Sequence, residues 1–448
     1  MTEFDIVVLG AGFAGLSAAA RLAGRGARVL VLEARARLGG RATAFPDRET
    51  GELVDNGQHV LLGCYTATFE FLRAIGAADN VRLQPQLAAT MIDRAGARTR
   101  LSCPSLPAPF HLIAGILDWD ALSWRDRLPI IGMATPLRNA RRELAGDGVR
   151  AASVDETAEQ WLVRNGQTPR LREMLWDPLA LAALNQPPAL AGATPFARVL
   201  AEMFGSDARA AAIALPVKPL SEMYAEPARA YIERRGGVVR TGTAAKILTD
   251  PGGTAVTGVE IGNEVIPAAR AISAVPWFAL PELFHRDLPP LQAALDGARR
   301  MVSSPIVTVN LWFDRPIVDE PFVGLPGRTM QWVFDKRSIF GGGASHLSLV
   351  SSGAEVVARR TNDDLIRIAN DELLDALPRA RSAKRLRATV LRELNATFSL
   401  APGQPARPPA DTGVKGLILA GDWTDTGLPA TIESAVRSGH RAADLCIG

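Results

Sequence analysis

The residues with the clearest chemical meaning form a glycine-rich turn near the start of the chain. Residues 10–15 read Gly-Ala-Gly-Phe-Ala-Gly, and Glu33 follows about 20 residues later, the spacing of a dinucleotide fingerprint. Gly12 lets the backbone approach a pyrophosphate, while Gly10 and Gly15 permit a tight turn and close helix packing. The N–H groups of a following helix attract phosphate, and Glu33 can bind ribose hydroxyls. The spacing predicts a dinucleotide site.

Two strands and a helix must hold this turn. Residues 4–9 and 27–32 are apolar runs typical of buried strands, and residues 16–24 between them have the small side chains of a packed helix. One βαβ unit with the fingerprint in its first turn favours a nucleotide-binding domain over an unrelated glycine-rich loop. The motif alone does not separate NAD from FAD.

Two further motifs favour FAD. Residues 39–41 read Gly-Gly-Arg, and a cation there can bind phosphate oxygens, which an NAD dehydrogenase does not need. Near the other end, the apolar strand 416–420 precedes Gly421-Asp422, and Pro429 favours the start of a last helix. A carboxylate just past a strand can hold a polyol hydroxyl, although an acid there is also a common helix cap. Together the motifs predict one FAD held by both ends of the chain.

These motifs resemble the FAD-dependent amine oxidase and phytoene desaturase superfamily. The middle of the chain fits as well, with a strand over residues 238–245 and a returning strand over residues 271–276. The resemblance implies an α/β fold in which a Rossmann-like FAD-binding domain is interleaved with an α+β substrate domain. The FAD contacts expected from the motifs and the resemblance are Gly10, Gly12, Phe13, Ala14, Gly15, Glu33, Ala34, Arg35, Gly40, Arg41, Gly57, Gln58, His59, Ala245, Gly421, Asp422, Thr431 and Ile432.

Three segments narrow the resemblance to the bacterial hydroxysqualene dehydroxylases. They are residues 54–65, 396–399 and 420–439, and the likeness runs over nearly the whole chain. Leu394-Asn395 depart from the pattern, because a basic residue is expected there. The family's reaction is the reductive removal of a hydroxyl from hydroxysqualene, which gives squalene for hopanoid biosynthesis.

The chemistry of that reaction points to an acid beside the flavin. Loss of the hydroxyl leaves a cation delocalised over neighbouring alkenes, and water leaves only when the oxygen is protonated. Reduced flavin would then deliver hydride from N5 inside a dry, apolar tunnel. Asp55 and His59 are the acid candidates, since both lie on the turn expected to pass the flavin. Asp55 can equally be a turn-forming carboxylate, and His59 a histidine packed on the cofactor.

Lysine and cysteine are scarce in the chain. None of the five lysines lies in the flavin-facing motifs, whereas amine oxidases often place one near flavin N5. Cys64, Cys103 and Cys446 show no metal or disulfide spacing, which favours a reducing compartment. Cys64 is either a redox-active thiol near the flavin or, more commonly for such a residue, a packed small side chain.

Composition limits the classes of partner. The 448 residues carry 50 basic and 47 acidic side chains, with no basic-aromatic interleaving, so nucleic acid is not expected. The five histidines show no metal-ligand spacing. We find no signal peptide and no apolar run of about 18 residues. We expect a cytoplasmic protein, peripheral on the inner face of the cell membrane.

A membrane contact is predicted near residues 104–142. Residues 106–117 are apolar and too short to span a bilayer, and Trp119, Trp124 and several arginines follow. Apolar side chains beside tryptophan and arginine suit a contact with anionic lipid. A core helix with a basic solvated face would show the same pattern.

The length of the chain favours two domains. The FAD-binding domain is expected at residues 1–80, 225–275 and 410–448, and the substrate domain at residues 81–224, mainly helical, and 276–409. Within the last segment we expect strands at residues 306–312 and 329–334 and a helix at 355–377.

Two other functions remain open on the sequence. One is a carotenoid or apocarotenoid desaturase, which would oxidise a polyene instead of reducing an alcohol. The other is a non-catalytic FAD-containing carrier of isoprenoids. The electron donor is not identified, because no separate NAD(P)H domain is evident.

Overall fold

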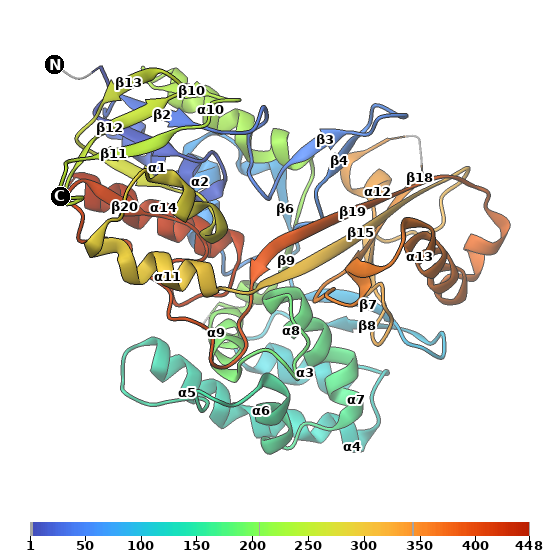
Figure 1. Ribbon diagram of the computed structural model, residues 1–448. Helices are drawn as coiled ribbons and strands as arrows, with labels where there is room; N and C mark the ends of the chain where they lie inside the picture. Colours follow the sequence, from blue (N-terminus) through green and yellow to red (C-terminus); the bar gives the residue numbers. More distant parts are fainter. Residues whose placement is uncertain (1–2, 206, 343–344, 448) are drawn as a thin grey trace.

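A computed structural model describes residues 3–205, 207–342 and 345–447 (Figure 1). One body is built on a parallel sheet and contains both ends of the described chain. A second body contains a large, mostly antiparallel sheet, with a layer of helices below it in Figure 1. Segments from distant parts of the sequence build each body, which agrees with the interleaved α/β architecture expected from the sequence.

The parallel sheet is the Rossmann-like core. Its strand order is β10-β2-β1-β14-β20, and every neighbouring pair is parallel. Because successive side chains point to opposite faces, Ile6 and Val8 pack on one side of the sheet and Val7 and Leu9 on the other. The strands are β1 (Ile6–Leu9), β2 (Val29–Leu32), β10 (Val238–Arg240), β14 (Ala271–Ser273) and β20 (Leu417–Leu419).

Helices cover one face of this sheet, and a small antiparallel sheet covers the other. α1 packs along α14, where a Cβ on Gly439 would lie 2.3 Å from Ala14 O. The elements on the helical face are α1 (Phe13–Gly24), α2 (Thr66–Ala74), α10 (Glu226–Glu233) and α14 (Ile432–Ile447). The other face carries β11 (Lys246–Thr249), β12 (Val256–Ile261), β13 (Glu264–Pro267) and α11 (Gln292–Arg300).

The large sheet has the order β19-β15-β18-β17-β16-β7-β8. All neighbours are antiparallel except β16 and β7. Its long strands β15 and β19 reach back to the Rossmann-like body (Figure 1). The strands are β7 (Ala88–Ile92), β8 (Arg98–Ser102), β15 (Ser303–Phe313), β16 (Phe322–Gly324), β17 (Trp332–Asp335), β18 (Ser345–Ser351) and β19 (Arg385–Phe398), and α13 (Asn362–Ala376) packs on them.

The helical layer comes from the segment predicted to be mainly helical. Its core contains the fully buried Trp161 and Trp176. The helices are α3 (Phe110–Asp118), α4 (Trp124–Arg127), α5 (Ala134–Leu144), α6 (Ala158–Arg164), α7 (Pro169–Leu171), α8 (Asp177–Leu184) and α9 (Ala193–Met203). The same segment also supplies β7 and β8, together with β6 (Val81–Leu83) and β9 (Ile213–Pro216), so its helical character is partial.

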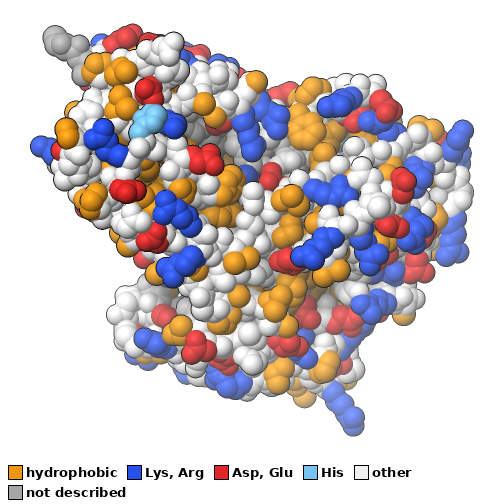
Figure 2. All heavy atoms as spheres, in the orientation of Figure 1, with side chains coloured by type: hydrophobic (Ala, Val, Ile, Leu, Met, Phe, Trp, Pro, Cys, Tyr) orange, Lys and Arg blue, Asp and Glu red, His pale blue; other side chains and the backbone are white. Residues whose placement is uncertain are grey.

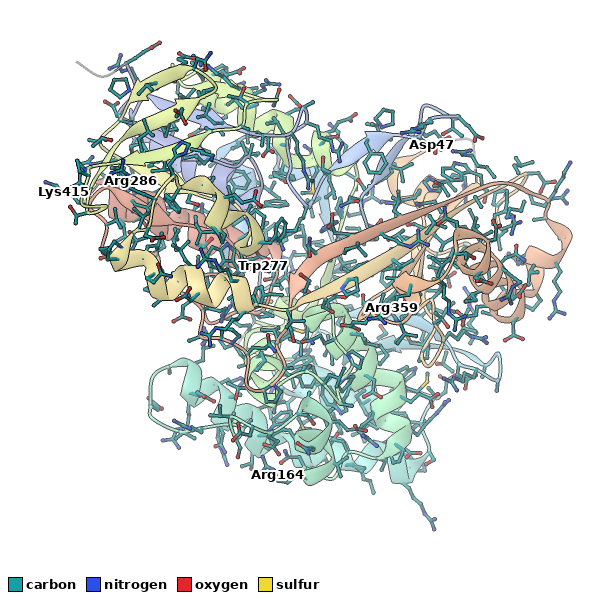
Figure 3. All side chains as sticks on the ribbon, in the orientation of Figure 1. Asp47, Arg164, Trp277, Arg286, Arg359 and Lys415 are labelled. Carbon is teal, nitrogen blue, oxygen red and sulfur yellow. The ribbon has the colours of Figure 1, made fainter. Side chains whose placement is uncertain are left out.

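Short elements connect the two bodies. The hairpin of β3 (Ala44–Pro46) and β4 (Leu53–Asp55) is tied to β19 by an ion pair of 2.6 Å between Asp47 and Arg387. β5 (Leu61–Leu62) pairs with β9, and α12 (Lys336–Phe340) follows β17. In Figure 3, Trp277 lies where the Rossmann-like body meets the ends of β15 and β19.

The two largest differences from the predicted element boundaries lie at residues 238–245 and 355–377. The strand expected over residues 238–245 ends at Arg240, because the chain then turns around the end of β2, where Thr243 N donates to Glu33 O at 2.8 Å. Gly242, with φ of +66°, permits this turn. The helix expected over residues 355–377 begins only at Asn362, where the Thr361 hydroxyl accepts from Asp364 N.

The surface carries both signs of charge. On the face drawn in Figure 2, lysine and arginine side chains are interspersed with aspartate and glutamate. Within the described ranges, we find no helix with both the length and the apolar character needed to cross a bilayer.

Candidate active site

One cavity of about 570 Å³ lies where the two bodies meet. Every residue of the predicted FAD site lines it except Gly15. Gly15 lies just behind the wall, where a Cβ would be 1.9 Å from Gly10 O, so its role is the close packing expected from the fingerprint. The cavity also extends past these residues into an apolar part between the large sheet and the helical layer.

The N-terminus of α1 forms one end of the cavity. Gly10 has φ of +101°, and a Cβ on Gly12 would meet no atom closer than 3.8 Å, so the backbone stays open toward the cavity. The first turn of α1 contains no acid, and Gly12 provides no side-chain cap. Free N–H groups and the positive end of the helix dipole therefore face the position that a pyrophosphate would take.

Glu33 ends β2 beside this helix. Its carboxylate is 7% exposed and accepts hydrogen bonds from Ala11 N at 2.8 Å and from Arg35 N at 2.9 Å. Each oxygen keeps a further lone pair for a ligand hydroxyl. The residues at this end therefore fit the adenosine and pyrophosphate half of FAD.

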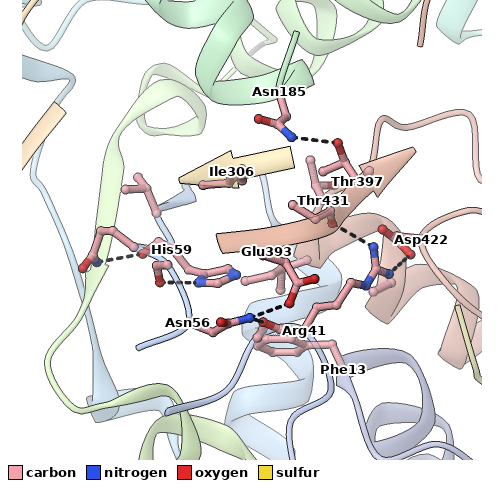
Figure 4. A pocket seen from close by; sticks show the side chains of 18 of the residues that line it. Phe13, Arg41, Asn56, His59, Asn185, Ile306, Glu393, Thr397, Asp422 and Thr431 are labelled. Carbon is pink, nitrogen blue, oxygen red and sulfur yellow. Dashed lines mark hydrogen bonds and ion pairs between the residues drawn. The ribbon is translucent and has the colours of Figure 1, made fainter. Parts of the chain in front are cut away.

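Arg41 joins the two ends of the chain. Its guanidinium forms an ion pair of 2.5 Å with Asp422 and donates to Ala396 O at 2.9 Å. The same group lies 5.3 Å from the ring centre of Trp277. The Gly-Gly-Arg and Gly-Asp motifs thus meet in one wall, as Figure 4 shows, and their polar groups can hold the middle of an extended FAD.

The start of α14 closes this wall. Thr431 and Ile432 line the cavity at the N-terminus of the helix. The buried carboxylate of Glu433 points away to α2, where it accepts from Ala67 N at 3.0 Å and Thr68 N at 2.9 Å. The positive end of α14 is therefore left to face the cavity, where it would stabilise negative charge on a flavin ring.

The turn over residues 55–59 contains both predicted acids, and the structure gives them different places. Asp55 is not among the described residues that line the cavity. Its buried carboxylate pairs with Lys336 Nζ at 2.8 Å and accepts from Leu220 N at 3.0 Å. A carboxylate held this way does not reach a substrate, so we assign Asp55 a positioning role instead of the acid role predicted from sequence.

Lys336 was missed because it lies far from the motifs in sequence. It is 4% exposed, and its ammonium also donates to Gln58 Oε1. The sequence places no lysine within the flavin-facing motifs, and Lys336 lies outside them in α12, but its ammonium contacts Asp55 and Gln58 of that turn. The ammonium also lies 4.7 Å from the ring centre of Phe340.

His59 lines the cavity in a defined tautomer. Its Nδ1 lies 2.9 Å from Gly57 O, and a carbonyl can only accept, so Nδ1 carries the hydrogen. Burial lowers the pKa of His59, and the charges of Lys336 and Arg41 lower it further, against the opposing effects of Asp55 and the Gly57 carbonyl. The imidazole is thus neutral, and its Nε2 is a hydrogen-bond acceptor.

Glu393 is a second residue that sequence reasoning missed. It lies on β19 and lines the cavity, and its Oε2 accepts from Asn56 Nδ2 at 2.7 Å. Figure 4 shows this bond beside Arg41, with the ring of His59 in the same pocket. The available signal was its position just before the recognised Ala396-Thr397-Phe398 segment.

The apolar part of the cavity extends away from the flavin end. Representative side chains in its wall are Met91, Leu101, Trp119, Leu175, Phe204 and Phe322. They come from the large sheet and the helical layer together. Cys64 packs against the same core, and burial raises the pKa of its thiol to about 12. The packed interpretation of Cys64 is therefore the one the geometry favours.

No cluster of three or more histidine, cysteine, aspartate or glutamate side chains that could hold a metal ion occurs in the described part of the chain.

Comparisons with known proteins give a consistent result. Residues 13–447 match the model of the family described as flavin containing amine oxidoreductase. Hydroxysqualene dehydroxylases of Rhodopseudomonas palustris and Sinorhizobium fredii are 31% and 30% identical, over 98% and 99% of this chain and 97% and 98% of their own length. A 15-cis-phytoene desaturase of an Oncidium hybrid is 26% identical over 99% of this chain and 78% of its own length.

Solved structures show the same fold. An oxidoreductase from Methanosarcina mazei superposes with a TM-score of 0.75 at 19% identity, covering 98% of this chain and all of that one. Cyclohexylamine oxidase from Brevibacterium oxydans superposes with a TM-score of 0.68, also at 19% identity, over 99% and 98% of the two chains.

Proposed function

Since the chain belongs to the flavin-containing amine oxidoreductase family, we propose that it removes the hydroxyl of hydroxysqualene reductively and releases squalene. The chain is an FAD-dependent oxidoreductase. The substrate is proposed from the names of the most similar relatives and from the cavity, whose flavin end continues into an apolar part. That continuity is the observation that carries the proposal, because an isoprenoid alcohol needs an apolar channel that ends at a flavin.

The residues that form the cavity and the turn beside it would have separate roles in this reaction. Bound FAD, when reduced, supplies the hydrogen and two electrons that replace the hydroxyl. The apolar wall excludes water from the substrate cation that forms when the oxygen leaves. Neutral His59 accepts a hydrogen bond from the substrate hydroxyl at Nε2 and so orients it. Asp55 and Lys336 hold the turn that presents His59.

Direct assay tests the proposal. The purified holoenzyme, reduced anaerobically with one equivalent of dithionite, should convert hydroxysqualene to squalene while its flavin returns to the oxidised spectrum. If the flavin stays reduced and no squalene forms, the proposed reaction is not the one catalysed.

A desaturase is the second candidate, favoured by the similarity to 15-cis-phytoene desaturases. Its electrons flow in the opposite direction, so a hydrocarbon polyene would reduce the oxidised flavin. Phytoene added anaerobically to the oxidised enzyme should leave the flavin spectrum unchanged under our proposal, and bleaching would favour the desaturase. The carrier hypothesis predicts no change of flavin state with either substrate.

Replacing His59 by alanine should lower the rate without removing the cofactor. A buried neutral hydrogen bond contributes roughly 1–3 kcal/mol when its loss leaves a group unpaired, so we expect a ~5- to 150-fold lower rate of squalene formation. Flavin content from the visible spectrum should stay at one per chain. A rate equal to that of the unchanged enzyme would contradict the role of Nε2.

We also propose a peripheral membrane contact through the face formed by Leu106, Phe110, Trp124, Leu128 and Ile131. These five side chains are between 41% and 66% exposed, although Trp119 between them is buried and lines the cavity. Arg125, Arg138 and Arg142 are exposed in the same 104–142 segment, and their charge suits anionic headgroups. Trp119 belongs to the core, so only part of the predicted 104–142 pattern is available to lipid.

The double substitution Phe110→Ser and Trp124→Ser should weaken binding to anionic vesicles at least 100-fold. Two large apolar side chains contribute about 1.5–3 kcal/mol each when buried, so their joint loss of about 3 kcal/mol or more corresponds to roughly two powers of ten. Vesicle sedimentation measures the change, and Leu386→Ser is the matched control, since Leu386 is 61% exposed on the large sheet. Equal loss in the control would show that the effect is not specific to the proposed face.

A further inference from the structure

Glu393 is a carboxyl group in the cavity wall, held beside the polar side chain of Asn56. In the β15–β19 ladder it pairs with Ile306, which lines the same cavity. Oε2 accepts the short bond from Asn56 Nδ2, whereas Oε1 receives only a 3.3 Å bond from Asn395 N. Asn56 thus fixes the orientation of the group, and Oε1 is the oxygen left to exchange a proton with a ligand in the cavity.

The other titratable groups that line the cavity either lie far from Glu393 or already have a partner. Glu33 and Arg35 lie at the adenosine end, and Arg41 is paired with Asp422. His59 has its one ring hydrogen on Gly57 O. Tyr65 lines the wall too, but burial raises its phenol pKa well above the usual value, so it is a weak proton donor.

We infer that Glu393 is the catalytic proton donor that turns the leaving hydroxyl into water. The inference rests on the proposed function and deepens it, because it names the acid that the reaction needs. Asn56 is a positioning residue that acts through Glu393. Since Asn56 and His59 belong to one short turn, the donor at Glu393 and the acceptor at His59 Nε2 face the same part of the cavity.

The proposed step is balanced in atoms and electrons when reduced FAD is the reductant. The Glu393 carboxyl gives its proton to the substrate oxygen, and the C–O bond breaks with its electron pair on oxygen, which leaves as water. The resulting substrate cation takes hydrogen with two electrons from the reduced flavin, which is thereby oxidised. The Glu393 carboxylate regains a proton from solvent before the next turnover, so one proton and one reduced flavin are consumed for each squalene.

The substitution Glu393→Gln tests the assignment. Glutamine keeps the size and can still accept from Asn56, but it cannot donate a proton as an acid. We expect flavin reoxidation by hydroxysqualene to slow at least 100-fold, the lower end of what a general acid contributes. Flavin content should be unchanged, and the Kd for hydroxysqualene, read from perturbation of the oxidised flavin spectrum, should stay within threefold.

The conservative variant separates an acid from a structural residue. Glu393→Asp keeps a carboxyl group in the cavity wall, so it should retain part of the rate that Glu393→Gln loses. Glu355→Gln is the matched control with wild-type behaviour, since Glu355 bonds Ser304 outside the described cavity wall.

Each outcome decides one point. A Glu393→Gln enzyme within threefold of the wild-type rate, or a Glu393→Asp enzyme no faster than Glu393→Gln, would overturn the assignment. Loss of flavin or of hydroxysqualene binding in Glu393→Gln would make the residue structural and overturn it as well. If the unchanged enzyme forms no squalene at all, the proposed function fails instead, and the two failures are distinguishable.

Discussion

Gly12→Ala should give a folded protein that no longer retains FAD. The new methyl would meet no protein atom closer than 3.8 Å, so the apoprotein accommodates it. It would, however, project toward the open space at the N-terminus of α1, where close approach of the backbone to the pyrophosphate is needed. We expect FAD affinity to fall at least 100-fold, while the melting temperature of the apoprotein stays the same.

Gly15→Ala is the matched comparison, because the same methyl meets a different environment. Its Cβ would lie 1.9 Å from Gly10 O and 3.2 Å from the Ala274 side chain, so helix and strand must move apart. Overpacking of this kind costs about 1–3 kcal/mol or more in unfolding free energy. Denaturant titration of both apoproteins, with flavin absorbance after reconstitution, would check the pair. Equal stability loss in both would contradict the assignment of Gly12 to the cofactor.

Lys336→Met should destabilise the protein by about 3–5 kcal/mol, the range for removing one partner of a buried ion pair. The side chains of Lys336 and Asp55 are only 4% and 2% exposed, so water cannot replace the lost ammonium. Gln58 Oε1 loses the hydrogen bond from Lys336 Nζ in the same substitution. Urea unfolding of the FAD-loaded protein measures the loss.

The double variant Lys336→Met with Asp55→Asn isolates the ion pair. An asparagine oxygen can still accept from Leu220 N, and no unpaired charge remains. We expect the double variant to recover at least half of the stability lost by Lys336→Met. If the two single losses simply add, the residues do not interact and the positioning role of Lys336 is wrong.

The sequence predicted the parts of the site that local backbone geometry determines. The glycine turn, Glu33 and the Gly-Gly-Arg and Gly-Asp motifs each lie within one short segment, so their spacing alone indicated their place, and all of these segments contribute residues to one cavity. The parallel strands were predictable for the same reason, as short apolar runs beside those turns. Among these strands, only the predicted ends were wrong. One example is β10, which ends at Arg240 because the chain then turns around Glu33.

The residues that were missed depend on contacts between distant segments. Lys336 lies 281 positions from Asp55, and Glu393 lies 337 positions from Asn56. No local pattern marks a lysine after β17 or a glutamate within a long strand, because each gains its role only when the large sheet docks on the Rossmann-like body. The acid role predicted for Asp55 was wrong for the same reason, since its partner Lys336 lies in a distant segment of the sequence.

The placement of β20 and α14 bears on which parts of the chain are needed to hold the cofactor. β20 pairs with β14 at the edge of the parallel sheet, and α14 packs along α1, so the wall opposite the fingerprint comes from segments distant from it in sequence. A fragment that contains only the first βαβ unit lacks this wall, so we expect such a fragment not to retain the flavin ring.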